Sequence, residues 1–178
     1  QQLQQSRFLS IVGSSGCGKS SLIRAGLIPK LQAGFLVEQR DQWRVATAKP
    51  GDAPVDNLAQ ALVEAFPEGS DTATLAEAIR MSCTQAVIEF LTVRLKESDA
   101  NLLLMIDQFE ELFTFGRYGE KEITEAEDAR DKDVQLLEKL ERERRRDEAA
   151  DYVTIMLGLA QTDLPVYVVM TMRSDFLG

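Results

Sequence analysis

Residues 8–20 carry the sequence FLSIVGSSGCGKS, and this stretch decides the fold. Its first part, Phe8–Val12, has the length and apolar composition of a buried β-strand. Its second part, Gly13–Ser20, has the spacing G-x-x-x-x-G-K-S, and apolar residues at helical intervals follow it. A glycine-rich turn between a strand and a helix directs backbone N–H groups at phosphate oxygens, and the helix N-terminus adds positive potential. The stretch therefore predicts a phosphate-binding loop.

The side chains of this loop have candidate roles in nucleotide binding. Lys19 has the length to contact the β- and γ-phosphates, and the hydroxyl of Ser20 is a ligand for Mg²⁺. Cys17 has two interpretations: a small residue that fills the loop, or a thiol whose pKa the helix N-terminus lowers. An ordinary glycine-rich turn is the alternative for the loop as a whole. The candidate nucleotide-binding residues are Gly13, Ser14, Ser15, Gly16, Cys17, Gly18, Lys19, Ser20 and Ser21.

A second apolar run, Leu102–Ile106, also ends on a residue with ligand chemistry, Asp107. Open α/β sheets bind ligands at the C-terminal ends of their strands. We therefore expect Asp107 at the same edge of the sheet as the loop. There its carboxylate can hold Mg²⁺ opposite Ser20.

The residues after Asp107 decide whether water can be activated for hydrolysis. Many ATPases place a glutamate directly after this aspartate, but here the position holds Gln108, which cannot take a proton. Glu110 and Glu111 follow three and four residues after the aspartate, about one helical turn away. We expect one of these two glutamates to activate the water; the alternative is that both stabilise the start of a helix.

Strand and helix patterns alternate along the rest of the chain. The expected strands are Phe8–Val12, Trp43–Ala48, Leu102–Ile106 and Val166–Thr171. The expected helices are Lys19–Ile28, which Pro29 ends or kinks, then Val55–Phe66, Thr72–Leu95 and Ala149–Gln161. Apolar strands separated by helices imply a parallel sheet that is covered on both faces, so the fold class is α/β.

Composition narrows the class of protein. The chain has 178 residues, 44% of them hydrophobic, which suits one domain with a buried core. It has no histidine and only two cysteines, Cys17 and Cys83, which excludes histidine-based catalysis, a zinc site and a disulfide scaffold. The formal net charge of −9 argues against a nucleic-acid surface. No apolar run approaches the length of about 18 residues that spans a bilayer, and no signal peptide is visible. We therefore expect no membrane segment and a cytoplasmic location.

Much of the charge is concentrated in residues 116–150, which hold 21 of the 49 charged side chains. Such a segment is typical of a solvated helix or a disordered insertion. A thin apolar stripe at Val134, Leu137 and Leu140 favours a short amphipathic helix within it. Docking of a partner is the alternative.

Together these motifs resemble the STAND class of P-loop NTPases (signal transduction ATPases with numerous domains), and in particular its bacterial branch of novel STAND NTPases. The matching segments are Phe8–Leu31 (FLSIVGSSGCGKSSLIRAGLIPKL), the Lys49–Pro54 turn, Leu102–Thr114 (LLLMIDQFEELFT) and Thr171–Leu177 (TMRSDFL). The resemblance implies a three-layer core of the additional-strand type, with the fourth strand inserted to give the strand order 1-4-3-2. We expect this core to span residues 1–178, with a charged insertion at 116–150.

The resemblance also implies a role for Arg173, which follows the last expected strand. In the family an arginine at this place resembles a sensor of the nucleotide state, and a guanidinium can form a bidentate contact with a phosphate. The alternative is an ion pair with Asp175 or a surface position.

Relatives of this kind continue into lid elements and carry sensor repeats or effector modules. The chain begins without Met and stops just after a strand, so we expect an excised fragment of a larger protein. The implied partners are further domains of the same chain (lid, sensor repeats or effector) and a nucleotide-dependent homo-oligomer, with no nucleic acid and no membrane.

Two functions follow from the motifs and the resemblance. The first is an ATP-binding and ATP-hydrolysing switch, with ATP and Mg²⁺ as cofactors and Lys19, Glu110, Glu111 and Arg173 acting in the reaction. The second is a nucleotide-gated scaffold with negligible hydrolysis, which Gln108 favours. A small-molecule kinase shares the loop but lacks support here, since no arginine-rich lid follows the core. Adenine is preferred because the guanine-reading pattern N-K-x-D is missing from the sequence.

Overall fold

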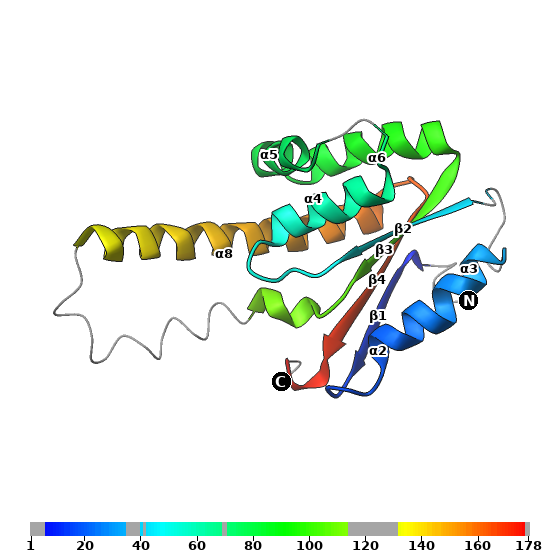
Figure 1. Cartoon of the computed structure of the whole chain (residues 1–178), viewed down its shortest axis with the longest axis horizontal. Coiled ribbons are helices and arrows are strands. Elements are labelled where there is room, and N and C mark those ends of the chain that lie inside the picture. Colours follow the sequence, from blue (N-terminus) through cyan, green and yellow to red (C-terminus); the bar gives the residue numbers. More distant parts are fainter. Residues whose placement is uncertain (1–5, 35–39, 41, 69–70, 114–131, 177–178) are drawn as a thin grey trace.

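The computed structural model describes residues 6–34, 40, 42–68, 71–113 and 132–176, and these form an α/β domain (Figure 1). Its strands are β1 (Phe8–Gly13), β2 (Gln42–Ala48), β3 (Ala100–Ile106) and β4 (Val166–Arg173). All neighbouring pairs are parallel, and the strand order is β1-β4-β3-β2. The expected fold class and strand order are confirmed, with β4 inserted between the loop strand β1 and the aspartate strand β3.

Helices cover both faces of this sheet, so the domain has three layers (Figure 1). One face carries the helical segment that follows β1, composed of α2 (Lys19–Ser21), η1 (Leu22–Leu27) and α3 (Ile28–Gln32). The other face carries α4 (Pro54–Ala65), α5 (Thr72–Ser82), α6 (Thr84–Ser98) and α8 (Lys132–Gln161).

The side chains of β3 show how the two layers of core are built. Every residue of this strand is buried, and the side chains alternate between the two faces as the pleat requires. Leu103 and Met105 pack with Ile23 and Leu31 of the helical segment after β1. The alternate residues of the strand, such as Leu104, pack with α4, α5, α6 and α8. The run Leu102–Ile106 is therefore apolar without interruption because both of its faces are covered.

Pro29 is expected to end or to kink the helix after the loop, and the structure shows that the helix does not end at this residue. Its middle part, η1, is a π-helical turn in which the N–H of Ile28 donates to the carbonyl of Ile23, five residues back. Pro29 then stands in the first turn of α3, which continues to Gln32. A proline lacks an N–H and clashes with the carbonyl four residues back in a regular helix, and the wider π turn accommodates this ring.

The expected single helix Thr72–Leu95 is wrong, because the chain breaks at Cys83 into α5 and α6. Cys83 has a φ of 47°, which interrupts the helical path. The break lets the apolar faces of both helices, with residues such as Ile79 and Leu91, reach the same core. Neither proline nor glycine marks this position, so the local sequence carries no signal for it.

Helix α8 is much longer than the expected Ala149–Gln161, since it begins at Lys132 and has 30 residues. Its C-terminal half is anchored in the core by side chains such as Tyr152 and Leu159. Its N-terminal half extends beyond the sheet (Figure 1), and there Leu137 and Leu140 are 62% and 52% exposed. The charged segment from Lys132 to Ala150 is thus the first part of this helix, whereas residues 116–131 lie outside the described residues. No helix in the described part of the chain is long and apolar enough to cross a membrane.

Candidate nucleotide site

The loop between β1 and α2 turns into the helix through a left-handed glycine. Gly18 caps α2 with a φ of 83°, a left-handed conformation that only glycine adopts without strain. Its carbonyl accepts the first helical hydrogen bond from the N–H of Leu22 at 2.8 Å. The N–H groups at the start of the helix are therefore directed towards the loop.

Lys19 lies folded over this loop. Its ammonium donates to the carbonyls of Gly13 and Ser14 at 2.8 and 2.7 Å, and it lies 3.8 Å from the exposed sulfur of Cys17. The positive charge of the side chain is thus held among the polar backbone atoms of the loop, in reach of an anion that enters it.

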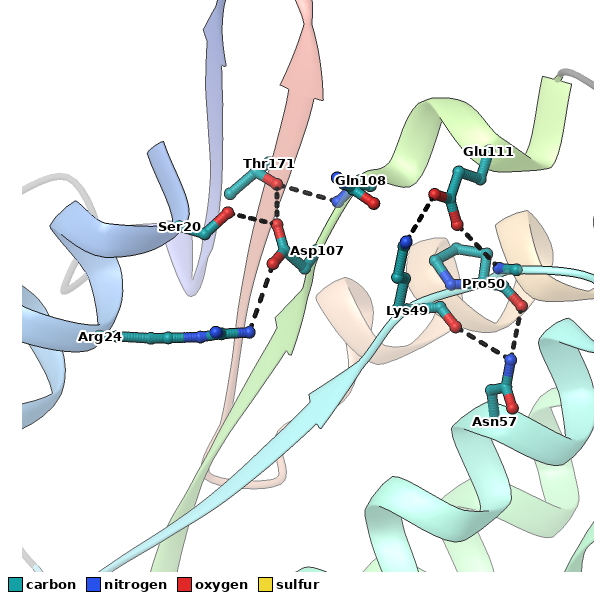
Figure 2. A network of polar contacts seen from close by, with 10 residues as sticks. Ser20, Arg24, Lys49, Pro50, Asn57, Asp107, Gln108, Glu111 and Thr171 are labelled. Atoms are coloured by element: carbon teal, nitrogen blue, oxygen red, sulfur yellow. Dashed lines mark hydrogen bonds and ion pairs between the residues drawn. The ribbon is translucent and has the colours of Figure 1, made fainter. Parts of the chain in front are cut away.

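Asp107 meets the loop helix at the C-terminal edge of the sheet, as expected (Figure 2). It continues the alternation of Leu103 and Met105, so its side chain points to the face that carries α2. The hydroxyl of Ser20 donates to Oδ1 of Asp107 at 2.6 Å, and Nη2 of Arg24 lies 3.4 Å from Oδ2. The structure thus brings the two expected cation ligands, Ser20 and Asp107, into direct contact, and Arg24 is an additional partner of Asp107.

The donor atoms at this point suit Mg²⁺. A hydroxyl and a carboxylate within hydrogen-bond distance offer the hard oxygen ligands that this ion prefers. The described residues contain no group of three or more His, Cys, Asp or Glu side chains that could hold a metal. A cation held by Ser20 and Asp107 would therefore take its other ligands from water and phosphate oxygens, which is the usual coordination of Mg²⁺ beside a nucleotide.

Thr171 of β4 is the third side chain on Asp107. Its hydroxyl donates to Oδ1 of Asp107 at 2.7 Å and accepts the N–H of Gln108 at 3.0 Å (Figure 2). Gln108 is exposed and has a φ of 57°, so the chain turns sharply as it leaves β3. This turn leads into η2 (Phe109–Phe113), a 3₁₀ helix that carries both candidate glutamates.

The two glutamates face different parts of the site. Glu110 is buried, and its carboxylate accepts the backbone N–H of Arg173 at the end of β4 at 3.2 Å. Glu111 instead forms an ion pair with Lys49 at 2.9 Å and accepts the N–H of Gly51 at 3.2 Å (Figure 2). The first glutamate thus lies beside the central strand, and the second lies over the turn between β2 and α4.

That turn is fixed from its other side by α4. The side-chain amide of Asn57 donates to the carbonyls of Lys49 and Pro50 at 3.2 and 2.9 Å (Figure 2). The Lys49–Pro54 segment is therefore linked both to η2 and to the first turn of α4.

Arg173 lies next to the phosphate loop, because it is the register partner of Gly13 across β1 and β4. Its guanidinium pairs with Asp175 and lies 5.8 Å from the ring centre of Phe176. The hydrogen bond from Arg173 lowers the pKa of the Asp175 carboxyl below its ordinary value. The ion pair that was the alternative for Arg173 is thus present, at a position beside the loop.

Sequence reasoning assigned no role to Thr171, Arg24 or Lys49. Thr171 did carry a signal, since it is a hydroxyl residue that ends an apolar strand at the ligand edge. Arg24 and Lys49 lie in segments that match the family, but their contacts could not be predicted, because their partners lie 83 and 62 residues away in the chain (Arg24 with Asp107, Lys49 with Glu111).

A parallel β1-β4-β3-β2 sheet, a G-x-x-x-x-G-K-S loop after β1 and an aspartate after β3 define a P-loop NTPase domain. The model of the family Novel STAND NTPase 1 matches residues 1–178, and the chain belongs to this family. A search of curated proteins gave no match. Among solved structures, the chain is similar to the pCW3 conjugation coupling protein TcpA in its monomer form with ATPgS. That similarity has 15% identity and a TM-score of 0.42, over 96% of this chain and 43% of TcpA.

Proposed function

We propose that this NTPase domain is an ATP-binding and ATP-hydrolysing switch of a signalling protein, which controls the assembly or activation of attached modules. The observation that carries the proposal is the 2.6 Å contact between Ser20 and Asp107 beside the glycine-rich loop. It joins the two side chains that nucleotide-binding loops of this type use for the metal–triphosphate complex. The missing N-K-x-D pattern supports adenine as the base.

In this proposal the glycine-rich loop makes most of the contacts with the nucleotide. Backbone N–H groups and the Lys19 ammonium receive the β- and γ-phosphates, and Ser20 and Asp107 hold the cation. When Mg²⁺ is bound with the nucleotide, it neutralises part of the negative charge of the phosphates.

Glu110 is the better of the two candidates for orienting and deprotonating water. It lies at the end of β4, the strand between the loop strand and Asp107, where the γ-phosphate is expected. Glu111 is held by Lys49 and Gly51 over the β2–α4 turn, so its two carboxylate oxygens are occupied away from the end of β4. We therefore assign water activation to Glu110. Glu111 instead stabilises the turn between β2 and α4 through its contacts with Lys49 and Gly51.

Arg173 is the residue that we expect to report the nucleotide state. Its partner Asp175 is half-exposed, so the guanidinium can exchange this ion pair for the γ-phosphate at little cost. Loss of the γ-phosphate on hydrolysis would return Arg173 to Asp175 and move the segment after β4.

A nucleotide-gated scaffold with negligible hydrolysis is the second candidate. It is favoured by Gln108, which stands where many ATPases have a glutamate. It is also favoured by the contacts that Glu110 and Glu111 already make within the chain, with the N–H of Arg173 and with Lys49. The two candidates share nucleotide binding and differ only in turnover.

The binding part is tested by titration calorimetry with ATP and Mg²⁺. Lys19→Ala should weaken ATP binding by at least about tenfold, because it removes charge-assisted hydrogen bonds to phosphate. Lys96→Ala, which changes an exposed lysine of α6, is the matched control and should bind as the wild type does. Unchanged affinity in Lys19→Ala would show that the phosphate-loop assignment is wrong.

Single-turnover hydrolysis separates the switch from the scaffold. Glu110→Gln should slow hydrolysis about 10²-fold or more, the usual effect of losing a general base. Glu111→Gln, which keeps the shape but not the charge, should have a much smaller effect. Equal rates near zero in the wild type and both variants would support the scaffold, and a larger loss in Glu111→Gln would reverse our assignment.

A further inference from the structure

Thr171 is one of the few polar side chains in the core of the described residues, with 1% of its surface exposed. The ladder between β3 and β4 ends at the pair Ile106 and Met170, one residue before it. Beyond that pair, the Thr171 hydroxyl continues the connection by bonding the side chain of Asp107 and the backbone of Gln108. A threonine hydroxyl can do this because it donates one hydrogen bond and accepts others.

The other two partners of Asp107 are less permanent. Arg24 has 59% of its side chain exposed and lies 3.4 Å from the carboxylate, so its attraction is screened by water. Ser20 is itself expected to turn its oxygen to the cation. Thr171 is therefore the partner whose bond to Asp107 persists when a metal–nucleotide complex binds.

The second bond of Thr171 acts on the path of the chain. The φ of 57° at Gln108 is unfavourable for a residue with a side chain, and the N–H that it exposes no longer has a strand partner. The Thr171 oxygen accepts this N–H and so stabilises the turn that directs η2, and with it Glu110, towards the end of β4.

We propose that Thr171 is a positioning residue for the metal–nucleotide site: its hydroxyl orients the Asp107 carboxylate towards the cation and holds the turn at Gln108. This inference rests on the proposed nucleotide binding. A preoriented carboxylate binds a cation better, because less conformational freedom is lost on binding. Thr171 therefore acts on the part of ATP affinity that depends on Mg²⁺.

The test compares ATP affinity with Mg²⁺ and with EDTA in three variants. Thr171→Val keeps the size and removes the hydroxyl, and it should lower ATP affinity about tenfold with Mg²⁺ while leaving affinity in EDTA within about twofold. Thr171→Ser keeps the hydroxyl and should restore most of the Mg²⁺-dependent affinity. Thr47→Val makes the same change on β2, beside Lys49 rather than Asp107, and should behave as the wild type.

A purely structural role would lower both affinities together, and that result overturns the inference. So does a Thr171→Val effect that persists in full in an Asp107→Asn background, because the hydroxyl would then not act through this carboxylate. Thr171→Ala is a second hydroxyl-free variant in case the valine variant does not fold. If the wild type binds no ATP under either condition, the proposed function fails; if it binds with Mg²⁺ dependence and Thr171→Val is unchanged, the inference alone fails.

Discussion

Asp107 has hydrogen-bond or ion-pair partners from three elements, and these partners differ in burial. Thr171 is buried, Ser20 is half-buried and Arg24 is mostly exposed. A charge-assisted bond is stronger where water is excluded, so the three contacts differ in strength although they share one carboxylate. In the proposed site, an arriving cation would displace the exposed arginine and leave the bond of the buried threonine in place.

Tyr152 gives a prediction at the scale of one residue. It is fully buried on α8, and within the described residues its hydroxyl has no hydrogen-bond partner. A buried hydroxyl without a partner costs free energy, so Tyr152→Phe should leave the free energy of unfolding unchanged or raise it by about 1 kcal/mol. Urea denaturation measures this change, and a loss of more than about 1 kcal/mol would contradict it.

The same side chain makes stability depend on alkaline pH. Burial raises the pKa of the Tyr152 hydroxyl above its ordinary value. The unfolded chain loses this proton near pH 10 while the folded chain retains it, so the free energy of unfolding falls as pH rises through that region. Tyr152→Phe should reduce this fall. Tyr167→Phe, which changes a half-buried tyrosine of β4, is the matched control.

At the scale of elements, the contact between α6 and α8 depends on a glycine. A Cβ on Gly158 of α8 would lie 2.3 Å from Cγ2 of Thr84, the first residue of α6, and real Cβ atoms do not approach so closely. The glycine therefore lets the start of α6, just after the break at Cys83, pack directly on α8.

Gly158→Ala should destabilise the domain by about 1 to 3 kcal/mol, because the clash outweighs the gain of about 1 kcal/mol in helix propensity. Thr84→Ser removes Cγ2 and is the matched test, since the alanine should cost much less in that background. Thermal and urea denaturation of the four proteins measure the coupling. A penalty that is equal in both backgrounds would show that the contact with Thr84 is not its cause.

At the scale of the whole molecule, Arg80 joins three helices on the face opposite the loop helix. Its guanidinium pairs with Asp56 of α4 at 2.6 Å and with Glu148 of α8 at 3.0 Å. Glu148 is 4% exposed, and Arg144 lies 3.4 Å from it. The long helix α8 is thus linked through α5 to α4, whose first turn holds the Lys49–Pro54 segment.

Arg80→Met should lower the free energy of unfolding by about 3 kcal/mol, because among the described residues it leaves the buried Glu148 carboxylate with the more distant Arg144 alone. Replacing both residues, Arg80→Met with Glu148→Met, should recover most of the loss, since an apolar pair leaves no buried charge. Urea denaturation of the two variants checks this, and a double variant that is no more stable than Arg80→Met would show that the unpaired Glu148 charge is not the cause of the loss.

The sequence alone determined the local parts of this protein. The loop at Gly13–Ser20 and the strand that ends at Asp107 could be recognised because glycine spacing and apolar runs are properties of adjacent residues. The α/β class followed from the alternation of those patterns, and the strand order from a family resemblance. The proximity of Ser20 and Asp107 could be predicted because the loop that leads to Ser20 leaves the C-terminal end of β1 and Asp107 follows the C-terminal end of β3, and these ends meet at one edge of a parallel sheet.

Only the tertiary structure decided what is not local. It broke the helix at Cys83, extended α8 to Lys132, and placed Glu110 and Glu111 on different partners although they are adjacent in sequence. It also brought Thr171 to Asp107, 64 residues away in the chain. Such contacts depend on how whole strands and helices pack, and a hydroxyl or carboxylate has no chemical role until packing determines which group lies within hydrogen-bond distance of it.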